Sequence, residues 1–98
     1  MPRLKIRRLV LDVLKPYDPE LHILASDIVE KFASVEGVNI TLYEMDRMTQ
    51  KVKLVLEGKN MDYDAIQEYL RSMNCIVHSL DQVVGGEKIV EDIDTPQD

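Results

Sequence analysis

The chain has few of the residues that mark several common classes of protein. It contains one cysteine, Cys75, one phenylalanine and no tryptophan in 98 residues. A single cysteine cannot close a disulfide within the chain, and the start has no apolar segment followed by a cleavage site, so we expect a reducing cytoplasm as its location. No apolar run approaches the roughly 18 residues of a membrane span, so no membrane is expected as a partner.

Positive charge is also scarce. Twelve Lys and Arg against eighteen Asp and Glu give a formal net charge of -6. This sign does not suit a protein that neutralises phosphates, so nucleic acid is not expected as a partner. The basic residues near the start and the acidic residues near the end are Arg3, Lys5, Arg7, Arg8 and Glu87, Glu91, Asp92, Asp94, Asp98. These two ends either stay solvated with weak mutual attraction or pair between neighbouring subunits.

Four apolar or alternating runs predict β-strands. They span residues 9–14, 38–45, 51–58 and 75–84. The two middle runs are joined through the short stretch DRMTQ, a spacing that fits a β-hairpin. The length fits one domain over residues 1–86, followed by an acidic tail over residues 87–98.

Two segments between these runs have the apolar spacing of helices. In the first, Asp18 is a good N-cap with Pro19 in the first helical position, and Gly37 would supply the positive φ that ends the helix. In the second, Asp62 is the N-cap and Asn74 suits the exit. The order strand, helix, strand, strand, helix, strand predicts an α+β fold of the ferredoxin-like βαββαβ type. In this fold a four-stranded antiparallel sheet carries both helices on one face.

The predicted sheet carries more apolar residues than two helices can cover. A sheet with one face in water should alternate cleanly, whereas several of these strands are apolar on both faces. The surplus residues, on the open face and the hairpin, are Val10, Tyr43, Met45, Met48 and Val55. Scattered exposed apolar residues are also ordinary in soluble proteins. We favour an interaction surface between identical chains, in a closed homo-oligomer such as a ring or a dimer.

Two carboxylates close the second predicted strand. Glu44 and Asp46 share the parity of the apolar residues in the run 38–42, so both would enter the core unless the hairpin projects past the helices. On a projecting hairpin their oxygens suit Ca²⁺ or Mg²⁺, with Asp12, Asp81 or a second subunit completing the site. Solvated charges that protect an edge strand explain the same residues.

The candidates for catalysis are weak. His78 and Asp81 lie on the last predicted strand with Cys75, but Cys75 and His78 have opposite parity there, and no second Cys/His pair exists. The chain lacks the paired cysteines of metallochaperones, the glycine-rich loop of acylphosphatases and the stacking aromatics of RNA-recognition motifs. We therefore expect a protein that is not an enzyme. A regulatory domain that senses a small metabolite bound between subunits is the alternative.

Four stretches of the chain together resemble one family. They are RRLVLDVLKPYDP, GVNITLYEMDRMT, VHSLDQVVGG and the terminal TPQD. The chain resembles, over essentially its whole length, an uncharacterised archaeal family of small proteins with a ferredoxin-like fold, known as a domain of unknown function. The family pattern has more small aliphatic residues in the first helix than LHILASDIVEKF. The resemblance implies a cytosolic archaeal protein that assembles as a ring-like homo-oligomer, and it implies no established activity.

Overall fold

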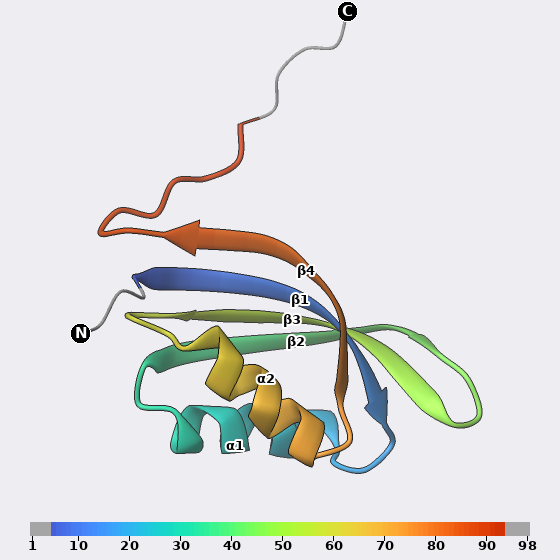
Figure 1. Cartoon of the computed structure of the whole chain (residues 1–98). Helices are drawn as coiled ribbons and strands as arrows, with labels where there is room; N and C mark the ends of the chain where they lie inside the picture. The colour runs from blue at the N-terminus through green and yellow to red at the C-terminus, as the bar shows by residue number, and fades with distance from the viewer. Residues whose placement is uncertain (1–4, 94–98) are drawn as a thin grey trace, which may run out of the picture.

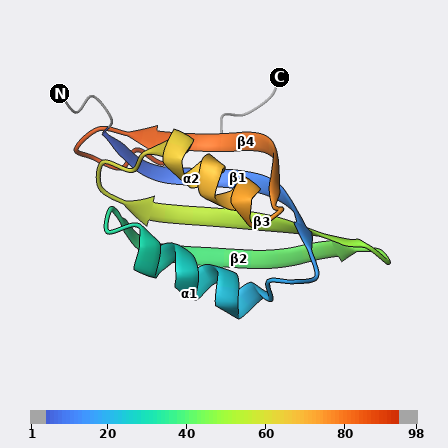
Figure 2. The ribbon, with the colours of Figure 1, turned by 60° about the horizontal axis from the view of Figure 1, so that its bottom comes forward.

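The computed structural model describes residues 5–93. Its elements are β1 (Ile6–Pro16), α1 (Leu21–Lys31), β2 (Val35–Met45), β3 (Thr49–Gly58), α2 (Tyr63–Ser72) and β4 (Ile76–Gly85). The strands form one antiparallel sheet in the order β2-β3-β1-β4, and both helices lie on the same face of it (Figures 1 and 2). The predicted ferredoxin-like fold is therefore confirmed. No helix among these residues is long and apolar enough to cross a bilayer.

The core lies between the two helices and one face of the sheet. Alternate residues of the central strands β1 and β3 point toward the helices, since successive side chains of a strand point to opposite faces. The completely buried apolar ones are Leu9, Leu11, Val13, Val52, Leu54 and Leu56. Leu24 and Ile28 of α1 and Ile66 and Leu70 of α2 close the core from the other side.

The predicted cap and exit of the second helix are confirmed. Asp62 is the N-cap of α2, and its side chain accepts a hydrogen bond from the Ala65 amide at 3.2 Å. Asn74, two residues after the end of α2, has a φ of 64°. Such a left-handed residue is the usual way in which a helix is ended when no glycine is present.

The first helix begins at Leu21, and the predicted cap at Asp18 is wrong. The side chain of Lys15 explains the difference, because it is completely buried below the loop that precedes α1. Its ammonium donates hydrogen bonds to the carbonyl oxygens of Pro16, at 2.7 Å, and of Pro19. The loop is wrapped around this buried cation, so its carbonyl groups point at the ammonium and do not start the helix.

The first helix also ends earlier than predicted. It stops at Lys31, and Phe32 takes an extended conformation with φ -116° and ψ 103°. Val35, which we expected on the helix, is instead the first residue of β2 and pairs with Gly58 of β3. Gly37 therefore lies within β2, beside a register shift, and does not end the helix.

The β2–β3 hairpin extends beyond the two helices, as expected (Figure 1). A β-bulge also changes the face on which its carboxylate lies. Leu42 pairs with Val52, but Glu44 pairs with Lys51, so Tyr43 is an extra residue in β2. The bulge places Glu44 on the open face with Lys51, away from the core face of Leu42. The expectation that Glu44 lies on the same face as Leu42 is thus wrong, because the strand is not regular at this point.

The edge strand β4 is interrupted by two further bulges. Its register with β1 shifts three times: once beside Arg7, where the extra residue is in β1, and twice in β4, between Gln82 and Leu80 and between Ser79 and Val77. The extra residues at the two shifts in β4 are Asp81 and His78. These bulges decide which β4 side chains reach the open face.

Candidate functional site

The open face of the sheet, on the side away from the helices, is built from cross-strand pairs of β1 and β3. Three pairs follow one another at its centre: Arg8 with Glu57, Val10 with Val55, and Asp12 with Lys53. Val10 and Val55 are half-buried. The face therefore has an apolar centre between charged groups, and it is more polar than the apolar patch that we expected.

Arg8 is the best anchored side chain of this face. Its Nε donates to a Glu57 carboxylate oxygen at 2.6 Å, and its Nη1 donates to the Gln82 amide oxygen at 3.3 Å. The same guanidinium binds both carboxylate oxygens of Glu91, at 2.8 and 3.0 Å. The hydrogen bonds that Arg8 donates to Glu91 and Glu57 raise the pKa of Arg8, and the guanidinium in turn lowers the pKa of Glu91. Two-point contacts of this kind fix orientation as well as charge.

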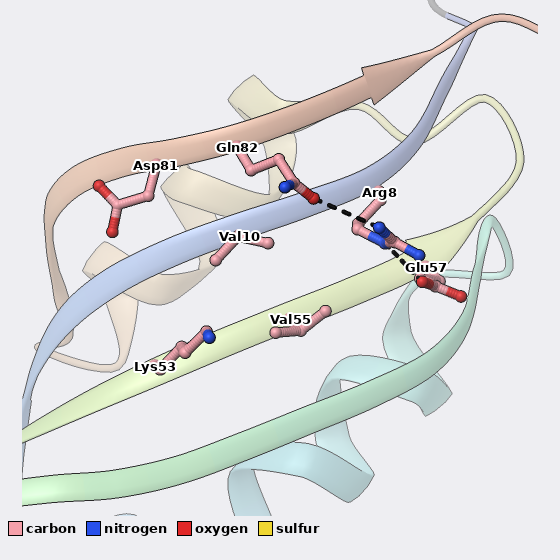
Figure 3. A pocket seen from close by; sticks show the side chains of 7 residues that line it. All are labelled: Arg8, Val10, Lys53, Val55, Glu57, Asp81 and Gln82. Carbon is pink, nitrogen blue, oxygen red and sulfur yellow. Dashed lines mark hydrogen bonds and ion pairs between the residues drawn. The ribbon is translucent and has the colours of Figure 1, made fainter. Parts of the chain in front are cut away.

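A shallow hollow of about 600 Å³ lies beside Arg8 on this face. Figure 3 shows its seven lining side chains, with Val10 and Val55 in the middle, Arg8 and its partners at one end and Lys53 and Asp81 toward the other. The lining residues come from β1, β3 and β4. They are Arg8, Val10, Lys53, Val55, Glu57, Asp81 and Gln82. We call this depression the open-face hollow.

The segment after β4 is held against the start of β1. Lys5 lies 3.5 Å from a Glu87 carboxylate oxygen, and Arg7 Nη1 donates to the Glu87 carbonyl oxygen at 2.7 Å. Together with the Arg8–Glu91 pair, these contacts show that the basic start and the acidic end attract one another within one chain. Arg3, Asp94, Asp98 and the terminal TPQD lie outside the described residues.

The four predicted metal ligands are engaged separately. Asp12 accepts a hydrogen bond from the Tyr43 hydroxyl, and Glu44 lies 3.7 Å from the Lys51 ammonium. Asp46 Oδ1 caps the hairpin turn, since it accepts from the Met48 and Thr49 amides, both at 2.9 Å, and Asp81 Oδ1 accepts from the Ser79 hydroxyl at 2.7 Å. The turn hydrogen bonds lower the pKa of Asp46. Within residues 5–93 no three His, Cys, Asp or Glu side chains converge as a metal site would require.

The five predicted interface residues divide into two groups. Val10 and Val55 form the centre of the open face, and Tyr43 joins them there through its bond to Asp12. Met48 is at the hairpin tip and is 76% exposed. Met45 pairs with Gln50 after the bulge, so its register places it on the helix-side face of the projecting hairpin. Our expectation that Met45 lies on the same side as Tyr43 is therefore wrong.

The remaining candidate residues do not come together as a reactive centre. His78 is exposed in a bulge of β4, whereas Cys75 is 1% exposed and points into the core. Burial raises the pKa of the Cys75 thiol, which disfavours the thiolate that a nucleophile requires.

Sequence reasoning missed Arg8 and the exposed apolar residues of β4. Leu80 and Val83 pair with the buried Leu11 and Leu9, yet they are 40% and 49% exposed, because β4 is an edge strand. The clue to Arg8 was present, since Arg8 directly precedes the predicted strand 9–14 and has the parity of Val10 and Asp12, so an extended chain places all three on one face. Only the register with β3 and the path of the tail identify its partners.

Fold and site together define a small ferredoxin-like α+β domain with an open, charged sheet face. Comparison with known proteins then gives the family. Residues 7–98 match the DUF211 family, described as "Uncharacterized ArCR", and the chain belongs to that family. The chain is also similar to "Uncharacterized protein MJ0319" of Methanocaldococcus jannaschii, with 47% identity over 93 residues that cover 95% of each chain. The archaeal-type family expected from the sequence motifs is thus confirmed.

Proposed function

We propose that the protein is a non-enzymatic assembly module of the cytoplasm that forms a closed, ring-like homo-oligomer through its open sheet face and projecting hairpin. The observation that carries the proposal is the one-sided cover of the sheet. Both helices lie on one face, and the other face has the Val10–Val55 pair at the floor of the open-face hollow. Exposed apolar side chains at the hairpin, Tyr43 and Met48, continue this surface. Identical chains are the partners most readily available to it.

The oligomeric state tests this proposal. Light scattering after size exclusion, over a dilution series, should give a mass of several chains for the wild type. Val55→Lys should shift that mass toward a single chain, because it places a charge in the centre of the contact. Val29→Lys is the matched control, since Val29 is 42% exposed on α1, in the other layer. A wild type that is monomeric at every concentration, or an equal effect of both variants, contradicts the proposal.

Divalent cations are the second part of this proposal. Glu44 is well exposed near the hairpin tip, and the turn keeps Asp46 as a carboxylate by lowering its pKa. In an assembly the same carboxylates recur in each chain, which supports a Ca²⁺ or Mg²⁺ site shared between subunits. Calorimetric titration with Ca²⁺ and Mg²⁺ tests it. The titration heat should be lost in Glu44→Gln and kept in Glu36→Gln, an exposed position at the other end of β2. No heat in the assembled wild type argues against cation binding.

One observation favours the alternative function, sensing of a small metabolite. A second hollow, of about 440 Å³, is lined by Tyr17, Glu20, Leu21, His22 and Gln50. The Gln50 Oε1 atom is buried and has no hydrogen-bond partner in the described part of the chain. A buried acceptor without a donor is costly, and a ligand with an N–H or O–H group would satisfy it once the Gln50 side chain turns toward the hollow. A thermal-shift screen separates the alternatives, because stabilisation by one metabolite class and not by Ca²⁺ or Mg²⁺ favours sensing.

A further inference from the structure

The tail segment, residues 87–93, presents apolar side chains that its own chain leaves in water. Ile89, Val90 and Ile93 are 37%, 70% and 77% exposed. The ion pairs Lys5–Glu87 and Arg8–Glu91 and the hydrogen bond from Arg7 to the Glu87 carbonyl oxygen hold the segment. The segment therefore has apolar surface available for burial against another chain.

At every second position of the tail segment, acidic and apolar residues take turns: Glu87, Ile89, Glu91 and Ile93, with Lys88, Val90 and Asp92 between them. In an extended chain alternate side chains point to the same side, so Glu87, Ile89 and Glu91 share one side. A rise of about 3.3 Å per residue places the two carboxylates about 13 Å apart, with Ile89 midway. One side of the segment thus offers an acid, an aliphatic group and a second acid.

The open-face hollow has two cations with an apolar pair between them, at the same spacing as the two acids and the isoleucine of the tail segment. Along β3, Lys53, Val55 and Glu57 are two residues apart, and Arg8 and Val10 of β1 lie opposite Glu57 and Val55. The two cations are therefore also separated by about 13 Å, with the valine pair between them. Lys53 is exposed, and within the described residues its ammonium forms no ion pair. The tail segment of the same chain contributes no lining residue to this hollow.

Within one chain, contacts with the start of β1 hold the beginning of the tail segment away from the open-face hollow. The Gly86 amide donates to the Lys5 carbonyl oxygen at 2.6 Å, and Glu87 contacts Lys5 and Arg7. Glu87 is thereby held beside the start of β1, and only Glu91 reaches the open face. The tail segment of a second copy has the same contacts, but once its exposed Lys5–Glu87 pair opens it can reach along the whole hollow of its neighbour.

We infer that the tail segment of one copy docks along the open-face hollow of a second copy. Its two carboxylates bind Arg8 and Lys53, and Ile89 covers Val10 and Val55. The exchange keeps a carboxylate on Arg8, replaces the exposed Lys5–Glu87 pair with a Glu87–Lys53 pair, and adds apolar burial. This inference rests on the proposed homo-oligomer, for which it names the connecting contact.

Cross-linking between single-site variants tests the contact. One variant carries Val55→Cys, the other Ile89→Cys, and the two are mixed and treated with a short bismaleimide. The wild type serves as the blank, because Cys75 is buried and its pKa is raised. Each variant has one reactive thiol, so a product that joins the two variants reports docking between copies. We expect at least tenfold more of it than from Ile23→Cys mixed with Ile89→Cys, since Ile23 is more exposed than Val55 but lies on α1.

Charge reversal provides a second, independent readout. Glu87→Lys on the tail donor should reduce the cross-linked product at least fivefold, because it opposes Lys53 of the acceptor. Lys53→Glu on the acceptor should restore the product in that mixture. A yield that does not respond to either change overturns the ion-pair part of the inference.

Light scattering on the same samples separates the two claims. An oligomer that gives no product above the Ile23→Cys control overturns the inference and leaves the proposed function standing. A protein that is monomeric at every concentration overturns both. An oligomer that gives the product, with the charge dependence described, supports both.

Discussion

Replacing Gly58 by alanine tests how closely the end of β3 packs against the segment before β2. A Cβ on Gly58 would overlap the Ser34 carbonyl oxygen and lie 2.9 Å from the Ser34 carbonyl carbon and 3.0 Å from the Val35 Cα. All three are backbone atoms, so they cannot rotate away like the end of a side chain. The Ser34 carbonyl oxygen also accepts a hydrogen bond from the Lys59 amide at 3.0 Å, which a displacement would weaken.

The expected loss follows from three contributions. Overpacking of a close contact costs about 1–3 kcal/mol. A weakened hydrogen bond adds about 1 kcal/mol, and the lower entropy of the unfolded chain with alanine offsets about 0.4–1 kcal/mol. The net destabilisation of Gly58→Ala is therefore about 1–4 kcal/mol, which for a domain of this size lowers Tm by on the order of 5–25 °C.

Urea unfolding followed by circular dichroism measures this loss directly. Gly37→Ala is the matched control, because a Cβ on Gly37 meets no atom within 4 Å and its φ is not in the left-handed region. That control should equal the wild type or be more stable by up to about 1 kcal/mol. If Gly58→Ala is as stable as Gly37→Ala, the close approach of Ser34 to β3 is refuted.

Three further predictions concern polar and charged groups. Lys15→Met leaves the carbonyl oxygens of the following loop without their donor and should cost about 2–4 kcal/mol in urea unfolding. Burial lowers the pKa of Lys15, so the unfolded chain holds this proton more tightly, and wild-type stability relative to Lys15→Met should rise as the pH approaches 10.5. The NMR signal of the Thr49 amide should titrate with a midpoint below 3.8, because its hydrogen bond lowers the pKa of Asp46. Asp12→Asn should bring the pKa of Tyr43 from about 12 toward 10.0 in an ultraviolet titration.

Each of these predictions has a control. Lys59→Met, at an exposed lysine, should stay within about 0.5 kcal/mol of the wild type. If Lys15→Met changes the free energy of unfolding equally little, the hydrogen bonds of the buried Lys15 ammonium do not stabilise the fold. The Thr49 titration should vanish in Asp46→Asn, and its persistence would assign it to another carboxyl group. The phenol that titrates highest should be missing in Tyr43→Phe. Because the hydrogen bond to Asp12 raises the pKa of Tyr43, the stability it contributes is present below pH 10.0 and is lost toward about pH 12.

The sequence predicted the fold because its periodicity is strong where the structure is regular. The alternation in the runs 38–45 and 51–58 and the cap at Asp62 agree with the observed elements. The boundaries of α1 failed where a long-range contact overrode a local signal. Asp18 and Pro19 resemble a helix start, but the buried Lys15 takes the Pro19 carbonyl group. No local pattern marks a lysine for complete burial, since lysine is mostly exposed.

The site was predicted less well, because its arrangement depends on register. Val10, Val55 and Tyr43 could be assigned to the open face by parity. One extra residue at Tyr43 then moved Glu44 and Met45 to faces opposite to those expected. A bulge of this kind has no reliable signal in a single sequence, because it is fixed by pairing with the neighbouring strand. Arg8 was assigned to the basic start of the chain, and only its partners identify it as an anchor.

The two irregularities of β4 have a consequence for how sheets of this protein can grow. A foreign strand added beside β4 would have to match an edge whose hydrogen-bond spacing changes at His78 and again at Asp81. Native sheets use such irregular edges to prevent unlimited side-by-side extension. Lateral growth into fibres is therefore disfavoured at this edge, and the proposed assembly would use the face of the sheet, where it can end in a finite particle.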